Sequence, residues 1–240
     1  MKIEKLTKTD LFLVQKEKGF KITLDSVLIS TFANVNKIKT AADLGCGTGG
    51  ILFLLKYRKP SLSLSGFELN RNYYSAVVKG IQLNGFENQI NVYNYDIRNL
   101  GSEFNKKFDM VISNPPYNSV NSTRISENSD ISDAKTELNG DFDDFSKTAF
   151  KLLKNKGKFV FIHSSKRFPE IMKTLNKNSF SPKRLRFVHP YINKKSNVFM
   201  MECTKYGGSF LNVEPPLIVY KDKKIYTDEI LSFYRNIYDS

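Results

Sequence analysis

Four consecutive residues, Asn114-Pro115-Pro116-Tyr117, carry the most specific chemical signal in the chain. The amide oxygen of Asn114 and the carbonyl oxygen of Pro115 can each accept one N–H bond from a planar amine, such as N6 of adenine. Two such bonds draw the nitrogen toward tetrahedral geometry and localise its lone pair, which makes it a better nucleophile. Tyr117 adds a flat face on which a base can stack. We therefore expect all four residues to be catalytic.

The same string also fits a simpler role, a proline-stiffened turn with a packed tyrosine. Its place in the chain favours chemistry, because the apolar run from Phe108 to Ile112 reads as a buried strand. The motif then lies where a strand of a parallel sheet becomes a loop, which is where ligands bind in such folds.

A second signal is the glycine-rich turn Gly45-Cys46-Gly47-Thr48-Gly49, between a short apolar strand and an apolar helix. Its spacing differs from the Gly-x-Gly-x-x-Gly of dinucleotide folds, and it lacks the Gly-Lys-Ser/Thr of triphosphate loops. Asp43, just before the glycines, argues against a phosphate ligand. The turn predicts a site for a zwitterion that carries an amino group.

Two further strands end in an acid. An alternating segment from Ser61 ends at Glu68, where such folds bind ribose hydroxyls. Another, from Ile90, ends at Asp96, which could accept a bond from an adenine amino group. The alternatives are a solvated surface acid for Glu68 and a helix N-cap for Asp96.

Taken in order, the glycine turn, the two acids and the Asn-Pro-Pro-Tyr string close successive strands. Right-handed crossovers put these strand ends on one edge of the sheet. The chain is therefore predicted to be α/β, with strands near 40–44, 62–68, 90–95, 108–113, 158–163, 184–189 and 197–205. We expect helices near 49–57, 71–84, 141–153, 167–178 and 228–238, one after Asp25 as its N-cap, and a last strand from Leu217 to Tyr220.

At this point the chain resembles the class I S-adenosylmethionine-dependent methyltransferases, whose Rossmann-like sheet has seven mostly parallel strands with helices on both faces. The resemblance implies S-adenosylmethionine as cofactor and S-adenosylhomocysteine as product. It assigns Asp43 and the glycines to the methionine part, Glu68 to the ribose and Asp96 to the adenine. The implied cofactor-binding residues are Thr23, Asp25, Asp43, Gly45, Cys46, Gly47, Gly49, Glu68, Leu69, Asp96, Ile97 and Asn114.

Flanking segments narrow the resemblance to the bacterial tRNA1(Val) (adenine-37-N6)-methyltransferases. Gly19 to Ile29 is similar to the family's N-terminal element, with Ile29 where a second Leu is usual, and Arg186 to Pro190 and Glu214 to Tyr220 resemble its tail. The resemblance implies N6-methylation of adenine 37 in tRNA1(Val). Three alternatives stay open: methylation of ribosomal RNA adenine or guanine N2, methylation of a protein glutamine amide, and a methyltransferase-like module that grips RNA without catalysis.

Length and composition bound the organisation. At 240 residues we expect one domain, with an N-terminal capping extension (1–36), a core (37–205) and a C-terminal extension (206–240). The charged N-terminus and two isolated cysteines, Cys46 and Cys203, predict a cytoplasmic protein without a membrane segment or a metal site. No obligate protein partner is indicated. His163 and His189 are expected to be structural, and Asn118 to Asn139 a long loop beside the site.

Charge predicts a polyanionic partner. The chain has 37 basic and 24 acidic residues, for a net charge of +13, and Lys151 to Met200 contains a single acid, Glu170. A solvated lysine-rich surface is the plainer interpretation, but such segregation favours a nucleic acid, here tRNA. The expected RNA-binding residues are Lys183, Arg184, Arg186, Tyr191, Lys194 and Lys195, which would contact phosphates, with Tyr191 available to stack.

Overall fold

The computed structural model describes residues 2–5, 11–15, 23–117, 140–223 and 225–238. The predicted loop from Asn118 to Asn139 lies outside the described residues, as do residues 19–22 of the N-terminal element that resembles the tRNA methyltransferases.

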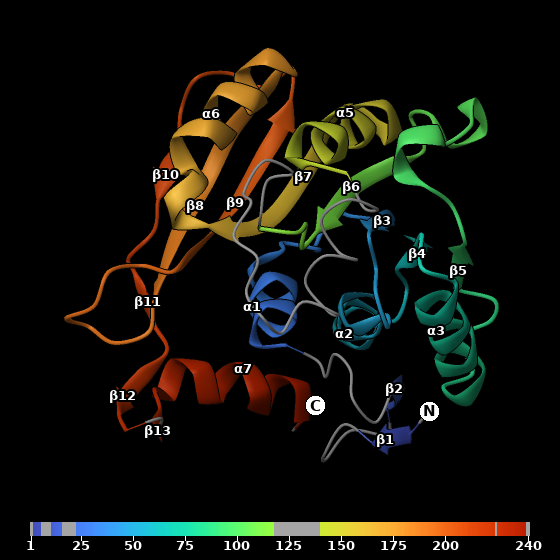
Figure 1. The fold of residues 1–240 in the computed structure, drawn as a ribbon, viewed down its shortest axis with the longest axis horizontal. Helices are drawn as coiled ribbons and strands as arrows, with labels where there is room; N and C mark the ends of the chain where they lie inside the picture. Colours follow the sequence, from blue (N-terminus) through green and yellow to red (C-terminus); the bar gives the residue numbers. More distant parts are fainter. Residues whose placement is uncertain (1, 6–10, 16–22, 118–139, 224, 239–240) are drawn as a thin grey trace, which may run out of the picture.

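A mostly parallel sheet forms the centre of the molecule (Figure 1). Its main strands are β3 (Thr40–Leu44), β4 (Ser63–Phe67), β5 (Ile90–Tyr93), β6 (Phe108–Ser113), β7 (Leu153–Ser164), β8 (Phe180–His189) and β9 (Val198–Lys205). Their spatial order is β8-β9-β7-β6-β3-β4-β5, and β9 runs antiparallel to both of its neighbours. The predicted seven-stranded α/β fold is confirmed. Two short strands, β10 (Asn212–Val213) and β11 (Leu217–Ile218), extend the sheet beside β8.

Helices cover both faces of the sheet (Figure 1). One face carries α1 (Leu24–Phe32), α2 (Gly50–Arg58), α3 (Arg71–Leu83) and α7 (Asp228–Tyr238). The other carries α5 (Phe142–Leu152) and α6 (Phe168–Lys177). Single 3-10 turns, η1 (Ile97–Asn99), η2 (Ser102–Phe104) and η3 (Ser165–Arg167), follow β5 and β7.

The central strands are apolar on both faces, because side chains alternate across a sheet that is covered twice. In β6, Met110 and Ile112 pack in the core on the α1–α2 side, while Val111 packs in the core under α5. Strand β7 repeats the pattern, with Ile162 on the first side and Phe161 on the second. This explains why both strands read as continuous apolar runs.

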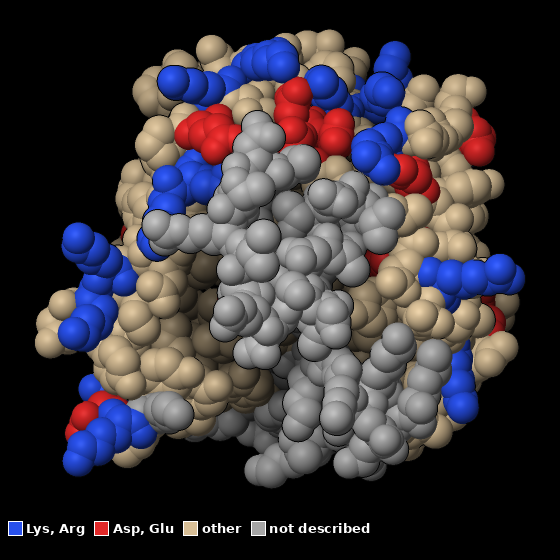
Figure 2. Space-filling view, viewed as in Figure 1, with Lys and Arg blue, Asp and Glu red and all other residues tan. Residues whose placement is uncertain are grey.

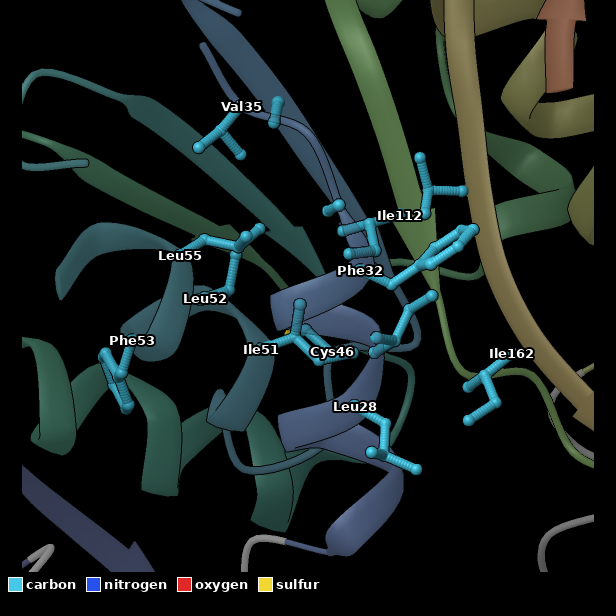
Figure 3. Close-up of a cluster of buried hydrophobic side chains, with 14 of the residues drawn as sticks. Leu28, Phe32, Val35, Cys46, Ile51, Leu52, Phe53, Leu55, Ile112 and Ile162 are labelled. Carbon is cyan, nitrogen blue, oxygen red and sulfur yellow. The ribbon is translucent and has the colours of Figure 1, made fainter. Parts of the chain in front are cut away.

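Helix α1 lies in the core and is not a loose extension. Figure 3 shows its Leu28 and Phe32 close to Ile112 and Ile162 of the sheet, and both are buried. The predicted N-cap, Asp25, was wrong: Thr23 caps the helix, and its hydroxyl oxygen accepts the Ser26 N–H at 3.2 Å. Asp25 lies in the first turn, so its carboxylate is available for a different contact.

The first strands are also anchored to the core. The antiparallel pair β1 (Lys2–Lys5) and β2 (Phe12–Gln15) lies beside α3 (Figure 1). The side chain of Asn84 accepts the Phe12 N–H at 2.8 Å and donates to the Phe12 carbonyl at 2.7 Å. Because this pairing mimics a neighbouring strand, it ties the N-terminal segment to α3.

The predicted strand from Leu217 to Tyr220 is in fact two elements. Strand β11 pairs with β8, whereas β12 (Tyr220–Asp222) pairs with β13 (Ile225–Tyr226) in a small separate sheet. The change occurs at Val219, whose N–H donates to the His189 carbonyl at 2.9 Å. The hairpin then leads into α7.

Candidate active site

The strand register brings the motif residues to one edge of the sheet. Leu44 pairs with both Phe67 and Ser113, and Phe67 pairs with Tyr93. The residues that follow these four are Gly45, Glu68, Asn114 and Asn94. Parallel strands that end at the same level deliver their next residues to the same edge, as predicted.

Every second residue of the glycine turn has a backbone conformation that favours glycine. Gly45, Gly47 and Gly49 have φ angles of 69°, 57° and 84°, in the left-handed region. A Cβ added to Gly47 would meet nothing within 4 Å, so its backbone borders open space. Gly49 is the N-cap of α2, and the turn therefore leads a helix N-terminus toward the site.

Asp43 is the most unusual group of the site. Its side chain is fully buried, and neither carboxylate oxygen has a hydrogen-bond partner among the described residues. Burial, and then the nearby negative charge of Glu68, raise the pKa of Asp43 well above its ordinary value. A buried carboxylate without a partner is costly, and a cationic ligand would offset that cost. The residues therefore fit a ligand with a positively charged amino group.

Glu68 is buried at the end of β4 and holds the loops around it. Its carboxylate accepts the Gly47 N–H at 2.8 Å and the Asn70 N–H at 2.7 Å. These bonds join the glycine turn to the start of α3. The plain alternative, a solvated surface acid, is excluded, because Glu68 is only 4% exposed.

Asp96 is a helix N-cap, the role that the sequence offered as the alternative to an adenine contact. It is the N-cap of η1, accepts the Arg98 N–H at 2.9 Å and pairs with the Arg98 guanidinium at 2.6 Å. Those bonds lower the pKa of Asp96. Nearby, Asn94 donates to the carbonyls of Glu68 and Leu69 at 2.8 and 2.9 Å. Ile97 is buried under α5, where its carbonyl accepts the Thr148 hydroxyl.

The Asn-Pro-Pro-Tyr motif leaves the end of β6 beside the glycine turn. Ser113, the residue before it, is buried and donates from its hydroxyl to the Leu44 carbonyl at 2.8 Å. Asn114 is half-buried, and no described residue forms a hydrogen bond with its side chain. Pro115 is buried, and Pro116 is half-buried. The amide of Asn114 is thus free to bind a ligand at the edge where Asp43 lies.

Tyr117 is held by contacts that the sequence did not indicate. Its hydroxyl donates to the Asp25 carboxylate of α1 at 2.7 Å, and its ring lies 5.1 Å from that of His163. Burial raises the pKa of the Tyr117 hydroxyl, so the group stays a donor. Asp25 and Tyr117 are 92 residues apart, and no sequence spacing could have paired them.

His163 ends β7 with its ring in the core. Its Nδ1 accepts the Ser164 N–H at 2.8 Å, so the neutral ring carries its proton on Nε2. Burial, and then the positive charge of Arg167, lower the pKa of His163 to about 4. The His163 ring beside Tyr117 is therefore neutral at physiological pH.

The predicted basic cluster divides into two kinds of residue. Arg184 donates to Glu214 at 2.8 Å and to the Phe32 carbonyl, and Arg186 donates to the Pro215 carbonyl and pairs with Glu229 at 2.7 Å. These arginines join β8 to its own neighbours. The side chain of Lys183 bonds backbone carbonyls of the segment after β9, which are Gly208 and Phe210.

The loop after β8, residues 190–197, carries the exposed part of the cluster. Lys194 and Lys195 are exposed, whereas Tyr191 is half-buried with its ring 5.5 Å from that of Tyr220. Figure 2 shows basic side chains at the left margin of the face, where Figure 1 draws this loop. The RNA-binding role of the cluster stays a prediction, and Lys194 and Lys195 are its most accessible members.

The described residues contain neither a membrane-spanning helix nor a cluster of metal ligands. None of the described helices is long and apolar enough to cross a membrane. In the same part of the chain, no three His, Cys, Asp or Glu side chains group as metal ligands would. The free cysteines, Cys46 and Cys203, are buried, and burial raises the pKa of both thiols.

The sheet order, the glycine turn and the acid after β4 define a class I methyltransferase fold. Residues 25–181 match the methyltransferase small domain family, and the chain belongs to that family. A crystal structure of a predicted O-methyltransferase from Agrobacterium tumefaciens has the same fold, with a TM-score of 0.71 and 18% sequence identity. The alignment covers 89% of this chain and 96% of that one.

Sequence relatives agree on one name. The chain is 30% identical over 152 residues to the tRNA1(Val) (adenine(37)-N6)-methyltransferase of Actinobacillus pleuropneumoniae, which is 63% of this chain and 62% of that protein. A protein of the same name from a Flavobacteriaceae bacterium is 24% identical over 92% of both chains. The chain spans 50% of the length of a third, from Histophilus somni, at 32% identity.

Proposed function

We propose that the protein transfers a methyl group from S-adenosylmethionine to N6 of adenine in tRNA, with adenine 37 of tRNA1(Val) as the target. The proposal rests on one observation. The side chain of Asn114, directly after β6, is half-buried and has no hydrogen-bond partner among the described residues. The neighbouring strand β3 holds Asp43, whose carboxylate also lacks a described partner. The two groups suit two ligands that must meet, a cationic donor and a planar amine.

The proposed cofactor half comprises β3, β4 and the turns that follow them. S-adenosylmethionine supplies an electrophilic methyl group on a sulfonium. Asp43 would bind its ammonium group, which offsets the burial of that carboxylate. The open backbone at Gly47 leaves space for the ligand, and Glu68 would accept from the ribose hydroxyls. Thr23, Gly45, Cys46, Gly49, Leu69, Asp96 and Ile97 stay predicted contacts.

The proposed acceptor half is the Asn-Pro-Pro-Tyr turn. The Asn114 oxygen and the Pro115 carbonyl would accept the two N–H groups of adenine N6, and Tyr117 would stack on the ring. Orientation provides most of the catalysis, because the methyl group is already electrophilic. Asn114 therefore has the role with the largest expected effect on turnover.

A tRNA substrate is supported by the names of the relatives and by the exposed lysines of the loop after β8. An anticodon-loop base is unpaired, so it can be turned out into a pocket at low cost. A tRNA substrate would also make the cytoplasm the site of action, and no obligate protein partner is proposed. Ribosomal RNA, guanine N2 and a glutamine amide remain alternatives.

A single assay tests the proposal. The protein is incubated with unmodified total tRNA and labelled S-adenosylmethionine, and the digested nucleosides are identified by mass spectrometry. The expected product is N6-methyladenosine, present in a tRNA1(Val) transcript and absent from the same transcript with guanine at position 37.

Two controls separate the alternatives. An Asn114→Ala variant should give no product, and Asn105→Ala, which changes an exposed asparagine before β6, should give the wild-type amount. N2-methylguanosine, or label on protein alone, would overturn the proposed substrate. Wild-type protein that binds no S-adenosylmethionine in calorimetry would overturn the proposed reaction and favour an RNA-binding module.

A further inference from the structure

The contact between Tyr117 and Asp25 joins the proposed acceptor loop to a different part of the fold. Asp25 lies in the first turn of α1, and Tyr117 lies directly after β6, so the bond connects a helix with the loop that receives the base. The oxygen–oxygen distance of 2.7 Å is that of a strong O–H···O bond to a carboxylate.

Both partners depend on this bond. Within the described part of the chain, the Tyr117 hydroxyl is the one hydrogen-bond partner of the Asp25 carboxylate. Burial raises the pKa of Asp25, while the bond from Tyr117 lowers it, so the hydroxyl favours the ionised form of the acid. If either side chain were lost, the polar group of the other would remain half-buried without a described hydrogen-bond partner.

Two more elements restrict the same residue. The ring of His163, at the end of β7, lies against the Tyr117 ring at an interplanar angle of 42°. Arg167 of η3 donates to the Tyr117 carbonyl at 3.3 Å and pairs with Glu170 through its other nitrogens. The hydroxyl, the ring and the backbone of Tyr117 are therefore each held by a separate element.

The Asp25 bond differs from the other two contacts in its direction. The contacts of His163 and Arg167 come from β7 and the turn after it, next to β6 in the sheet. Asp25 instead comes from α1, which packs on β7 and α2 and whose residues Leu28 and Phe32 lie in the core. A ring fixed at its outer atom by a core helix cannot rotate freely about its side-chain torsions.

We propose that Asp25 is a positioning residue for the methyl-acceptor base, which it orients through the hydroxyl of Tyr117 without touching cofactor or base. This inference rests on the proposed function, because it assigns the acceptor side of that same site. It gives Asp25 a different role from the cofactor contact that the family resemblance implies. The stacking face is held ready before the base arrives, so less ordering is needed on binding.

The test is a double-mutant cycle with Asp25→Ala and Tyr117→Phe. Tyr117→Phe keeps the stacking ring and removes only the hydroxyl. We expect each single variant to raise KM for the tRNA1(Val) transcript about tenfold, and the double variant to be no worse than either one, because both remove the same bond. Asp25→Asn, which keeps an acceptor oxygen, should recover most of the loss. Asn34→Ala, an exposed change just after α1, is the matched control.

Cofactor affinity distinguishes positioning from a cofactor contact. Calorimetry with S-adenosylmethionine should give the same Kd, within twofold, for wild type, Asp25→Ala and Tyr117→Phe. Urea unfolding of the four proteins should show non-additive losses of stability, which reports the bond itself.

The outcomes are distinct. Additive effects on KM, or a weaker cofactor Kd for Asp25→Ala that persists in the Tyr117→Phe background, would overturn the role of Asp25 and leave the proposed function intact. Wild-type protein that binds cofactor and methylates no RNA would overturn the proposed function, and the positioning role with it. An active wild type whose Asp25→Ala variant has unchanged KM would overturn the positioning role alone.

Discussion

The two halves of the proposed site lie side by side on one edge of the sheet and differ in how their charged groups are paired. The half formed after β3 and β4 contains two buried carboxylates, Asp43 and Glu68, and burial, followed by the charge of Glu68, raises the pKa of Asp43. In the half formed after β6 and β7, Tyr117 packs on the neutral His163 ring, and the charged groups nearby are paired: Asp25 with the Tyr117 hydroxyl and Arg167 with Glu170. In the first half, two like charges lie together and Asp43 has no described partner, whereas the second half presents the uncharged Asn114 amide and flat rings.

The difference suits each half to a different one of the two proposed ligands. A bound cation would reduce the repulsion between two buried carboxylates, so the first half suits an ammonium or sulfonium group. An uncharged acceptor such as the Asn114 amide suits a neutral amine, whose lone pair must stay available for attack. An unpaired carboxylate in the acceptor half would bind the cationic donor as well, so the bond between Asp25 and Tyr117 helps to keep the two ligands apart.

The strongest test of the comparison is Asn114→Ala. If the proposed role is correct, loss of the amide oxygen removes one of the two proposed acceptors for the attacking nitrogen, and we expect kcat for tRNA methylation to fall on the order of 10³-fold. Calorimetry should give an S-adenosylmethionine Kd within twofold of wild type, because the cofactor half is intact. A variant with wild-type turnover would refute the role of Asn114.

The neutral His163 ring predicts a specific pH dependence of stability. Folding lowers the pKa of His163 from 6.5 to about 4. The stability that the neutral ring contributes is therefore fully present above pH 6.5 and is lost as the pH falls toward 4. Urea unfolding of wild type should lose about 2 kcal/mol between pH 7 and pH 5 through this group. His163→Asn, which keeps an acceptor for the Ser164 N–H, should flatten the curve. An unchanged slope, compared with a His189→Asn control, would place the titration elsewhere.

For the half with Asp43 and Glu68, one substitution should raise the stability of the protein and weaken cofactor binding. Asp43→Asn removes a buried charge without a described partner, so the protein without cofactor should melt at a higher temperature at neutral and alkaline pH. Because the pKa of Asp43 is raised, its ionisation destabilises the folded protein as the pH rises. The stability of the Asp43→Asn variant should not decline in this way. The same change should weaken S-adenosylmethionine binding about tenfold in calorimetry. A variant that binds cofactor normally would show that Asp43 does not meet the ammonium group; Asp222→Asn is an exposed control.

The smallest effect concerns the basic residues, which also divide into two kinds. Lys194→Glu with Lys195→Glu should raise the tRNA Kd about threefold at moderate salt and lower the salt dependence of log K by about 2, with little change in stability. The same reversal at Lys37 and Lys39, before β3 at the opposite edge, is the matched control. An unchanged salt slope would exclude the loop after β8 as an RNA contact.

Much of the fold and of the site could be predicted because local patterns report it. The apolar run at 108–112, the alternating strands that lead to Glu68 and toward Asp96, and the glycines at 45, 47 and 49 mark strand ends without any tertiary information. Parallel topology then requires those ends to share an edge. The errors followed from local competition: Thr23 and Asp25 are both good caps, and Leu217 to Tyr220 reads as one strand until Val219 bonds to His189.

The amino-acid sequence alone determined the α/β class, most of the strands and helices, and the place of the Asn-Pro-Pro-Tyr string and the glycine turn at strand ends, because backbone periodicity and special residues act over a few positions. The tertiary structure alone decided which charges are paired and which are not. It joined Arg184 to Glu214 and Tyr117 to Asp25, and it left Asp43 without a described partner. Such contacts join residues far apart in the chain and depend on burial, which no short stretch of sequence specifies.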